Sequence, residues 1–90
     1  MLKLEITKQA RNFFKILPPK QYRQVFNKIL SLLENPRPAD SEQLQGHPYR
    51  RADVGEYRIV YRVHEDCLVV VLVGKRNDDE IYRLLKKLPE

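Results

Sequence analysis

The 90-residue sequence has one cysteine, three glycines and two histidines, and these low counts exclude several kinds of site. A single cysteine, Cys67, cannot form an internal disulfide or a zinc site built on several thiolates, and we expect it to be a small buried residue. His47 and His64 lack the spacing of metal ligands or of a general acid–base pair, so we expect both on the surface. Neither a P-loop nor a dinucleotide-binding glycine motif is present. The sequence therefore predicts no metal ion and no cofactor.

Long apolar segments are also missing from the chain. No stretch approaches the roughly 18 uninterrupted apolar residues of a membrane span, and the start MLKLEITKQAR lacks the apolar segment of a signal peptide. We therefore expect a cytoplasmic protein without membrane contact. Apolar residues make up 42% and charged residues 32% of the chain, which is typical of one globular domain over residues 1–90. The net charge of +5 favours a polyanionic partner such as nucleic acid.

The N-terminal half reads as a strand followed by two helices. Residues 2–6 alternate apolar and charged side chains, as in a strand with one buried face. A short amphipathic helix is predicted between Thr7, its N-cap, and Pro18, and a longer one from Pro19 to Asn35. The polar face of the longer helix is interpreted as solvated rather than as a phosphate-contacting face. The two helices form a hairpin whose wide apolar surface needs a flat apolar cover.

The C-terminal half supplies that cover. Residues 35–48 are rich in proline and polar residues and are predicted to be a connecting loop. Strands are predicted over residues 49–54, 56–63 and 68–73, and the valine-rich last strand should be covered on nearly both faces. A third helix is predicted from an N-cap at Asn77, through the acidic first turn Asp78, Asp79 and Glu80, to its end at Pro89. The order β-α-α-β-β-β-α predicts an α+β fold with a mainly antiparallel sheet of about four strands and the N-terminal helical hairpin packed on it.

The first predicted hairpin brings arginines together. If its turn is Val54–Gly55, Arg51 lies directly opposite Arg58, where like charges destabilise the strand pair. One interpretation is a surface ion-pair network in which Asp53 and Glu56 supply the carboxylates. The other is an anion site, because paired guanidinium groups bind phosphate oxygens bidentately. The pattern alone leaves both open.

The second predicted hairpin ends in a basic pair, Lys75 and Arg76. A turn at Glu65–Asp66 would place Lys75 on the face of Arg58, whereas a turn longer by one residue would place Arg76 there instead. Tyr82 lies about 100° away from the apolar stripe of the last helix, so it is expected at the boundary of the core. It is either an ordinary boundary aromatic or a ring on which a nucleobase stacks beside the arginines.

The segments RRADVGEYRIVYRV, VGKR and NDDEIYRLLKKL resemble, in this order, the RelE toxins of bacterial and archaeal toxin–antitoxin modules, in the RelE/ParE superfamily. The resemblance implies a small RelE-like fold and a metal-independent endoribonuclease that cuts messenger RNA in the ribosomal A site, by attack of a ribose 2′-hydroxyl on the adjacent phosphate. It implies catalytic roles for four residues: Arg51, Arg58, Arg76 and Tyr82. RNA contacts are expected at three more positions: Arg50, Arg62 and Lys75.

The resemblance also implies partners and alternatives. The expected partners are a cognate antitoxin, the ribosome with its mRNA, and operator DNA bound through the antitoxin. The alternatives are a ParE-like inhibitor of DNA gyrase and a catalytically weak homologue that serves as antitoxin partner and corepressor. Two departures bear on activity. Asp53 stands where many relatives carry an arginine, and Arg51 is a poor general base, which leaves ribosomal positioning of the substrate or a carboxylate, Glu56 or Asp53, to assist proton removal.

Overall fold

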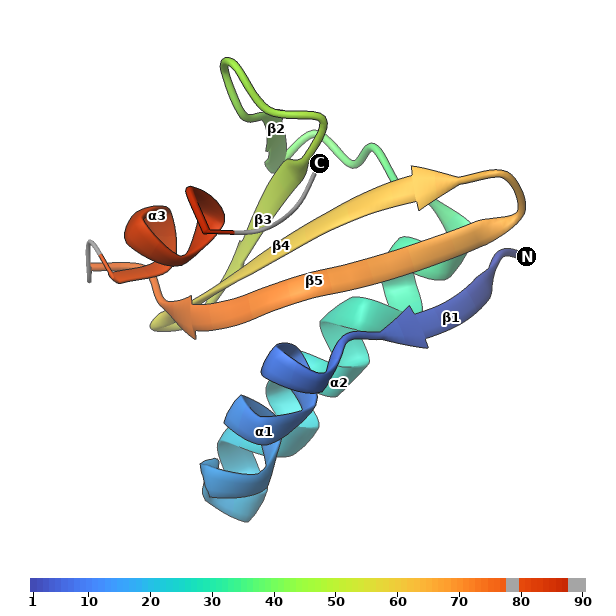
Figure 1. Ribbon diagram of the computed structural model, residues 1–90. Helices are drawn as coiled ribbons and strands as arrows, with labels where there is room; N and C mark the ends of the chain where they lie inside the picture. Colours follow the sequence, from blue (N-terminus) through green and yellow to red (C-terminus); the bar gives the residue numbers. More distant parts are fainter. Residues whose placement is uncertain (78–79, 88–90) are drawn as a thin grey trace.

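The computed structural model of the protein describes residues 1–77 and 80–87. The elements in chain order are β1 (Lys3–Ile6), α1 (Lys8–Ile16), α2 (Pro19–Glu34), β2 (Ser41–Gln43), β3 (Arg50–Val54), β4 (Tyr57–His64), β5 (Cys67–Lys75) and α3 (Glu80–Leu85) (Figure 1). The strands form one sheet in the order β1-β5-β4-β3-β2, in which only the β1–β5 pair is parallel. The predicted α+β class is confirmed.

The prediction of about four strands was too low, because residues 35–48 are not entirely loop. Ser41–Gln43 forms the edge strand β2, which pairs with β3 through Ser41 opposite Ala52 and Glu42 opposite Arg51. These three polar residues show no apolar alternation, so no periodicity signals a strand. Their pairing depends on β3, which lies later in the chain.

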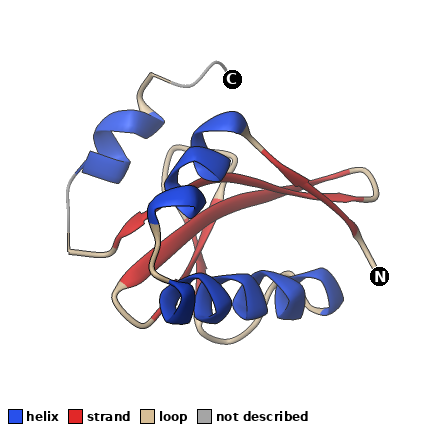
Figure 2. Ribbon diagram, turned by 90° about the horizontal axis from the view of Figure 1, so that it is seen from below, coloured by secondary structure: helices blue, strands red, loops and turns tan. Residues whose placement is uncertain are grey.

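The N-terminal helices are as the sequence predicts. Thr7 is the N-cap of α1, and its hydroxyl oxygen accepts a hydrogen bond from the Ala10 backbone N–H at 3.2 Å. Pro19 occupies the first position of α2, and Asn35 is the residue at which α2 ends. Figure 2 shows α1 and α2 in front of the strands, so the predicted helical hairpin does pack on one face of the sheet. The fully buried side chains between these layers include Val25, Ile29, Leu32, Ile59, Tyr61, Leu68 and Val70.

A β-bulge at Val71 changes which residues share a face. Tyr61 pairs with Val70, but Val60 pairs with Leu72, so Val71 is an extra residue in β5. The Thr7 hydroxyl donates a hydrogen bond of 2.6 Å to the Val71 carbonyl, which gives this bulged residue a partner from outside β4. The hairpin turn is Glu65–Asp66, as one of the two predicted registers has it. With this turn and no bulge, Lys75 would lie on the face of Arg58. The extra residue at the bulge shifts the pairing by one, so Arg58 pairs with Gly74 and its face continues toward Arg76, as predicted for the longer turn.

The opposite face of the sheet carries α3. Ile81 and Leu85 of this short helix are buried with Tyr49, Val60 and Leu72 in a second apolar cluster. Gly74 lies under the helix, and a Cβ atom there would contact the Ile81 side chain at 3.5 Å. The predicted acidic positions Asp78 and Asp79, like the predicted end at Pro89, lie outside the described residues. Within the described ranges, no helix has the length and apolarity needed to cross a membrane.

Candidate functional site

The β3–β4 hairpin places Arg58 opposite Asp53, so the predicted pairing of Arg58 with Arg51 is wrong. The turn consists of Gly55 and Glu56, one residue later than predicted, and Arg51 pairs with Val60. Gly55 has φ of +58°. A type II′ turn requires glycine at its first position, and the prediction had placed the glycine at the second. The observed pairing of β3 with β4 differs from the predicted pairing by two residues, and side chains two residues apart on a strand share a face. Arg51 and Arg58 therefore still lie on one face, as diagonal neighbours with the Asp53 carboxylate beside them.

Asp53 connects the two arginines. Arg58 donates from Nε to Asp53 Oδ1 at 2.7 Å and from Nη2 to Oδ2 at 3.2 Å, which is a bidentate pair. Arg51 donates from Nη1 to Asp53 Oδ2 at 3.3 Å and from Nη2 to Glu42 Oε2 at 2.7 Å. Exposure of the side chains is low, at 14% for Arg58, 21% for Arg51 and 26% for Asp53. The ion-pair network is therefore present, with Glu42 of β2 in the place expected for Glu56.

The electrostatics of the site centre on Asp53. The hydrogen bonds from Arg58 lower the pKa of the Asp53 carboxyl, and the charges of Arg58, Arg51 and Arg76 lower it further against the opposing effect of burial. The same hydrogen bonds, which Arg58 donates to Asp53, raise the pKa of Arg58, and the contact with Tyr82 raises it further. Asp53 is therefore an ionised hydrogen-bond acceptor, and its lowered pKa makes it a weaker general base than an ordinary aspartate.

Helix α3 places Tyr82 against Arg58. The Tyr82 hydroxyl accepts a hydrogen bond from Arg58 Nη1, and the Arg58 guanidinium carbon lies 5.7 Å from the centre of the Tyr82 ring. The residue is 36% exposed, which agrees with the boundary position predicted from its place on the helix. Part of the ring therefore remains open to a ligand beside the arginines.

Arg76 lies where β5 ends, next to the β3–β4 turn. Its backbone N–H donates to the Glu56 carbonyl at 2.9 Å, and its Nη1 donates to the Gly55 carbonyl at 3.3 Å. The side chain is exposed, in contrast to those of Arg51 and Arg58. Arg51, Arg58 and Tyr82 thus lie together around Asp53 on the α3 side of the sheet. Arg76 lies at the neighbouring β3–β4 turn, and its charge also acts on Asp53.

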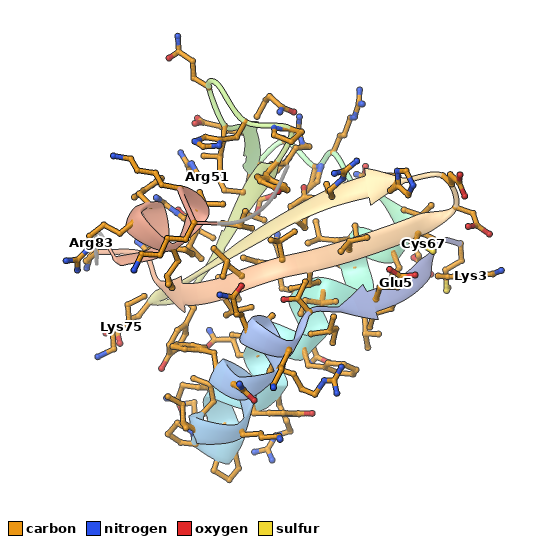
Figure 3. All side chains as sticks on the ribbon, in the orientation of Figure 1. Lys3, Glu5, Arg51, Cys67, Lys75 and Arg83 are labelled. Atoms are coloured by element: carbon orange, nitrogen blue, oxygen red, sulfur yellow. The ribbon has the colours of Figure 1, made fainter. Side chains whose placement is uncertain are left out.

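The three additional predicted RNA contacts are not gathered there. Lys75 pairs with Tyr57, whose ring contacts Phe13 of α1, so its backbone position belongs to the helical-hairpin face. Figure 3 labels Lys75 and Arg51 at well-separated positions. Arg50 donates from Nη2 to Ser41 Oγ at 2.7 Å, and its Nε is buried and has no hydrogen-bond partner within residues 1–77 and 80–87.

Arg62 is the third of these residues and lies toward the far end of β4. Its Nη2 is 3.5 Å from His64 Nδ1, and the two residues line an open hollow of about 200 Å³ together with Val69. His64 is exposed as predicted, whereas His47 is half-buried beside Tyr49, with ring centres 6.3 Å apart.

Cys67 lies apart from the arginines, at the start of β5. Figure 3 shows it near Glu5 and Lys3 of β1. Its thiol is 3.6 Å from the carboxylates of both Glu5 and Asp66. Partial burial and these negative charges raise the pKa of the thiol, which disfavours the reactive thiolate. Cys67 is half-buried rather than fully buried as predicted.

Comparison with known proteins identifies the class to which this fold and site belong. Residues 4–80 match the family described as ParE toxin of the type II toxin–antitoxin system parDE. The chain therefore belongs to this family of toxins, within the RelE/ParE superfamily, and the predicted resemblance is confirmed. No protein of curated function matches the sequence significantly.

Solved structures of RelE toxins share the fold. Isolated Escherichia coli RelE is 26% identical, with 97% of each chain covered and a TM-score of 0.76. The toxin in the intact E. coli RelBE complex is 27% identical, with 83% of this chain and 96% of that chain covered and a TM-score of 0.74. An archaeal RelE–RelB complex from Pyrococcus horikoshii gives 25% identity, 83% and 94% coverage and a TM-score of 0.73.

Proposed function

We propose that this type II toxin is a metal-independent endoribonuclease that cleaves messenger RNA in the ribosomal A site. The observation that supports this proposal is the contact between Arg58 and Tyr82, on the same face as Arg51 and next to Arg76. A guanidinium cluster beside a partly exposed aromatic ring can bind a phosphate and stack the adjacent base. The two features together suit a single-stranded RNA substrate.

In the proposed reaction the ribose 2′-hydroxyl attacks the adjacent phosphate and the 5′-oxygen leaves. The products are a 2′,3′-cyclic phosphate, or the 3′-phosphate formed from it, and a 5′-hydroxyl. The arginines stabilise the added negative charge of the phosphorane-like transition state, and one well-placed donor contributes about 3 kcal/mol to such a step. Tyr82 orients a base beside the reacting phosphate.

The proton of the 2′-hydroxyl has no convincing acceptor among the four residues. A guanidinium does not deprotonate at neutral pH, which excludes Arg51 as a base. Asp53 is engaged by two arginines and has a lowered pKa. We therefore assign most of the catalysis to the ribosome, which would align the 2′-hydroxyl with the phosphate.

The proposal includes partners and a place of action. The E. coli and P. horikoshii relatives were crystallised as toxin–antitoxin complexes, which supports a cognate antitoxin for this chain. The antitoxin would connect the toxin to operator DNA, and action on ribosomes would take place in the cytoplasm.

A gyrase inhibitor is the second candidate. It is favoured by the matching family, which is named for ParE. The neutralisation of Arg51 and Arg58 by Asp53 and Glu42 also favours it, because a protein that only binds another protein does not need unpaired guanidinium groups.

Induction of the toxin in cells, with the 5′ ends of messenger RNA mapped, tests the proposal. We expect growth arrest and new 5′ ends at codon-related positions for the wild type. Arg76→Ala should reduce cleavage about 100-fold or more, because it removes a phosphate-binding charge. Tyr82→Phe should also reduce cleavage, because it removes the hydroxyl that positions Arg58.

Arg83→Ala is the matched control, since Arg83 is the exposed neighbour of Tyr82 on α3, and it should cleave like the wild type. Growth arrest by Arg76→Ala at wild-type strength without new 5′ ends would rule out the nuclease. Inhibition of supercoiling by purified gyrase in the presence of the protein would then identify the second candidate.

A further inference from the structure

Asp53 lies at the place in the site that an RNA phosphate would need. Its two carboxylate oxygens accept three hydrogen bonds, two from Arg58 and one from Arg51. All three site arginines act on this carboxylate electrostatically, since the charge of Arg76 also lowers its pKa. The carboxylate therefore marks the position where the positive potential of these arginines converges.

The way Arg58 binds Asp53 is also the way a guanidinium binds phosphate. In both cases two parallel N–H groups donate to two oxygens of one anion. The third nitrogen of Arg58, Nη1, donates to Tyr82, and the side chain is only 14% exposed. An RNA phosphate cannot make the same bidentate contact unless Asp53 gives up its place.

The charges of the paired residues cancel. Arg51 and Arg58 contribute two positive charges, and Asp53 and Glu42 contribute two negative charges through ion pairs of 2.7 to 3.3 Å. Glu42 differs from Asp53 in two ways. It is 69% exposed at the edge of the sheet, and among the described residues its carboxylate is ion-paired with Arg51 and not with Arg58. Asp53 is thus the carboxylate that competes for Arg58.

We propose that Asp53 is an internal substitute for the RNA phosphate, which an incoming phosphate must displace to reach Arg58. This inference rests on the proposed function in taking RNA as the anion. Asp53 keeps the affinity for free RNA low, so that the toxin engages RNA only where another partner presents it. The residue thereby restricts the substrate to RNA that is held in place.

Binding of a short fluorescein-labelled 2′-O-methyl oligoribonucleotide to the purified toxin tests this role, because such RNA cannot undergo 2′-hydroxyl attack. Asp53→Asn and Asp53→Ser should each tighten binding about tenfold or more, since they free a charge-assisted donor pair. The slope of log affinity against log salt should steepen by about 0.7 for each charge released. Glu42→Gln is the matched control and should change affinity by about twofold at most.

A double variant assigns the gain to Arg58. In Asp53→Asn combined with Arg58→Met, the tighter binding should disappear, because the released guanidinium is gone. A measurement on the wild type is free of any folding defect of the variants. In its NMR spectrum the Arg58 Nε–H resonance should shift when the oligoribonucleotide saturates the protein. Unchanged or weaker binding in both Asp53 variants, or an Arg58 resonance that does not move, would overturn the inference.

Failure of the proposed function gives a different pattern. Suppose that wild-type toxin leaves messenger RNA intact in cells but that the Asp53 variants bind the oligoribonucleotide more tightly. The competition between Asp53 and phosphate for Arg58 is then supported, and the proposed nuclease function is contradicted. If the wild type cleaves but the variants bind no better, Asp53 only orders the arginines and the inference is wrong.

Discussion

The two faces of the sheet differ in what covers them. On the helical-hairpin face, two helices bury a continuous apolar layer, and Ile29, Ile59 and Tyr61 are fully inaccessible to solvent. On the other face, the short helix α3 covers a smaller apolar cluster, and the charged network around Asp53 lies beside it. The first face stabilises the fold through apolar burial, whereas the second leaves charged and aromatic groups accessible to a ligand.

Matched truncations on the two faces should have different consequences. Ile59→Ala leaves a cavity in the fully buried layer and should lower the free energy of unfolding by about 2–5 kcal/mol. Ile81→Ala truncates a buried side chain of the apolar cluster between α3 and the sheet, so the helix should detach while the sheet stays folded. Urea unfolding measures the first effect, and hydrogen exchange of the α3 amides measures the second.

Ile16→Ala is the control for these truncations, because this side chain is 74% exposed and its loss should change stability by less than about 0.5 kcal/mol. Equal global losses for Ile59→Ala and Ile81→Ala would mean that the two faces fold as one unit, against the division described above.

The hydroxyl of Thr7 links helix α1 to the bulge in β5 and should have an intermediate effect. Thr7→Val removes both the N-cap of α1 and the donor to the bulged Val71 carbonyl, which together should cost about 2 kcal/mol. Thr7→Ser keeps the hydroxyl and should stay within about 0.5 kcal/mol of the wild type. Thermal or urea unfolding of both variants measures the difference, and a Thr7→Val protein as stable as Thr7→Ser would show that the bulge needs no such partner.

The smallest effect is the pH dependence that Asp53 contributes. The pKa of Asp53 is lower in the folded state than in the unfolded state, so the folded protein binds fewer protons. The ionised Asp53 carboxylate therefore stabilises the folded protein fully at pH values above its unfolded pKa of about 3.9. The contribution is lost as the pH falls through the lowered folded pKa. Unfolding of the wild type and Asp53→Asn should therefore differ at neutral pH and converge in acid. A difference that persists unchanged in strong acid would show that Asp53 acts through something other than its charge.

The sequence predicted the helical layer with few errors because its signals are local. An apolar period near 3.6, the N-cap Thr7 and the prolines at positions 18 and 19 all act within one or two turns of a helix. The valine-rich segment of β5 was equally clear, since a strand covered on both faces needs a continuous apolar run.

The charged network could not be predicted in the same way. Glu42 reaches Arg51 only because β2 pairs with β3, and the sequence of β2 has no strand pattern. Arg58 meets Asp53 rather than Arg51 because the turn uses Gly55 at its first position. Both outcomes depend on hydrogen bonding between segments, and composition and periodicity carry little information about it.

The helices, the strands other than β2, and the choice of Arg51, Arg58, Arg76 and Tyr82 as the residues of interest could all be predicted from the sequence. That the Asp53 carboxylate lies between Arg51 and Arg58 follows from the pairing of β3 with β4. The physical reason is that apolar burial acts on whole faces and tolerates small shifts, whereas a turn or bulge that moves one residue changes which charges meet. In this protein the turn at Gly55 set Asp53 opposite Arg58, and the bulge at Val71 put the strand end at Arg76 rather than Lys75 on the same face.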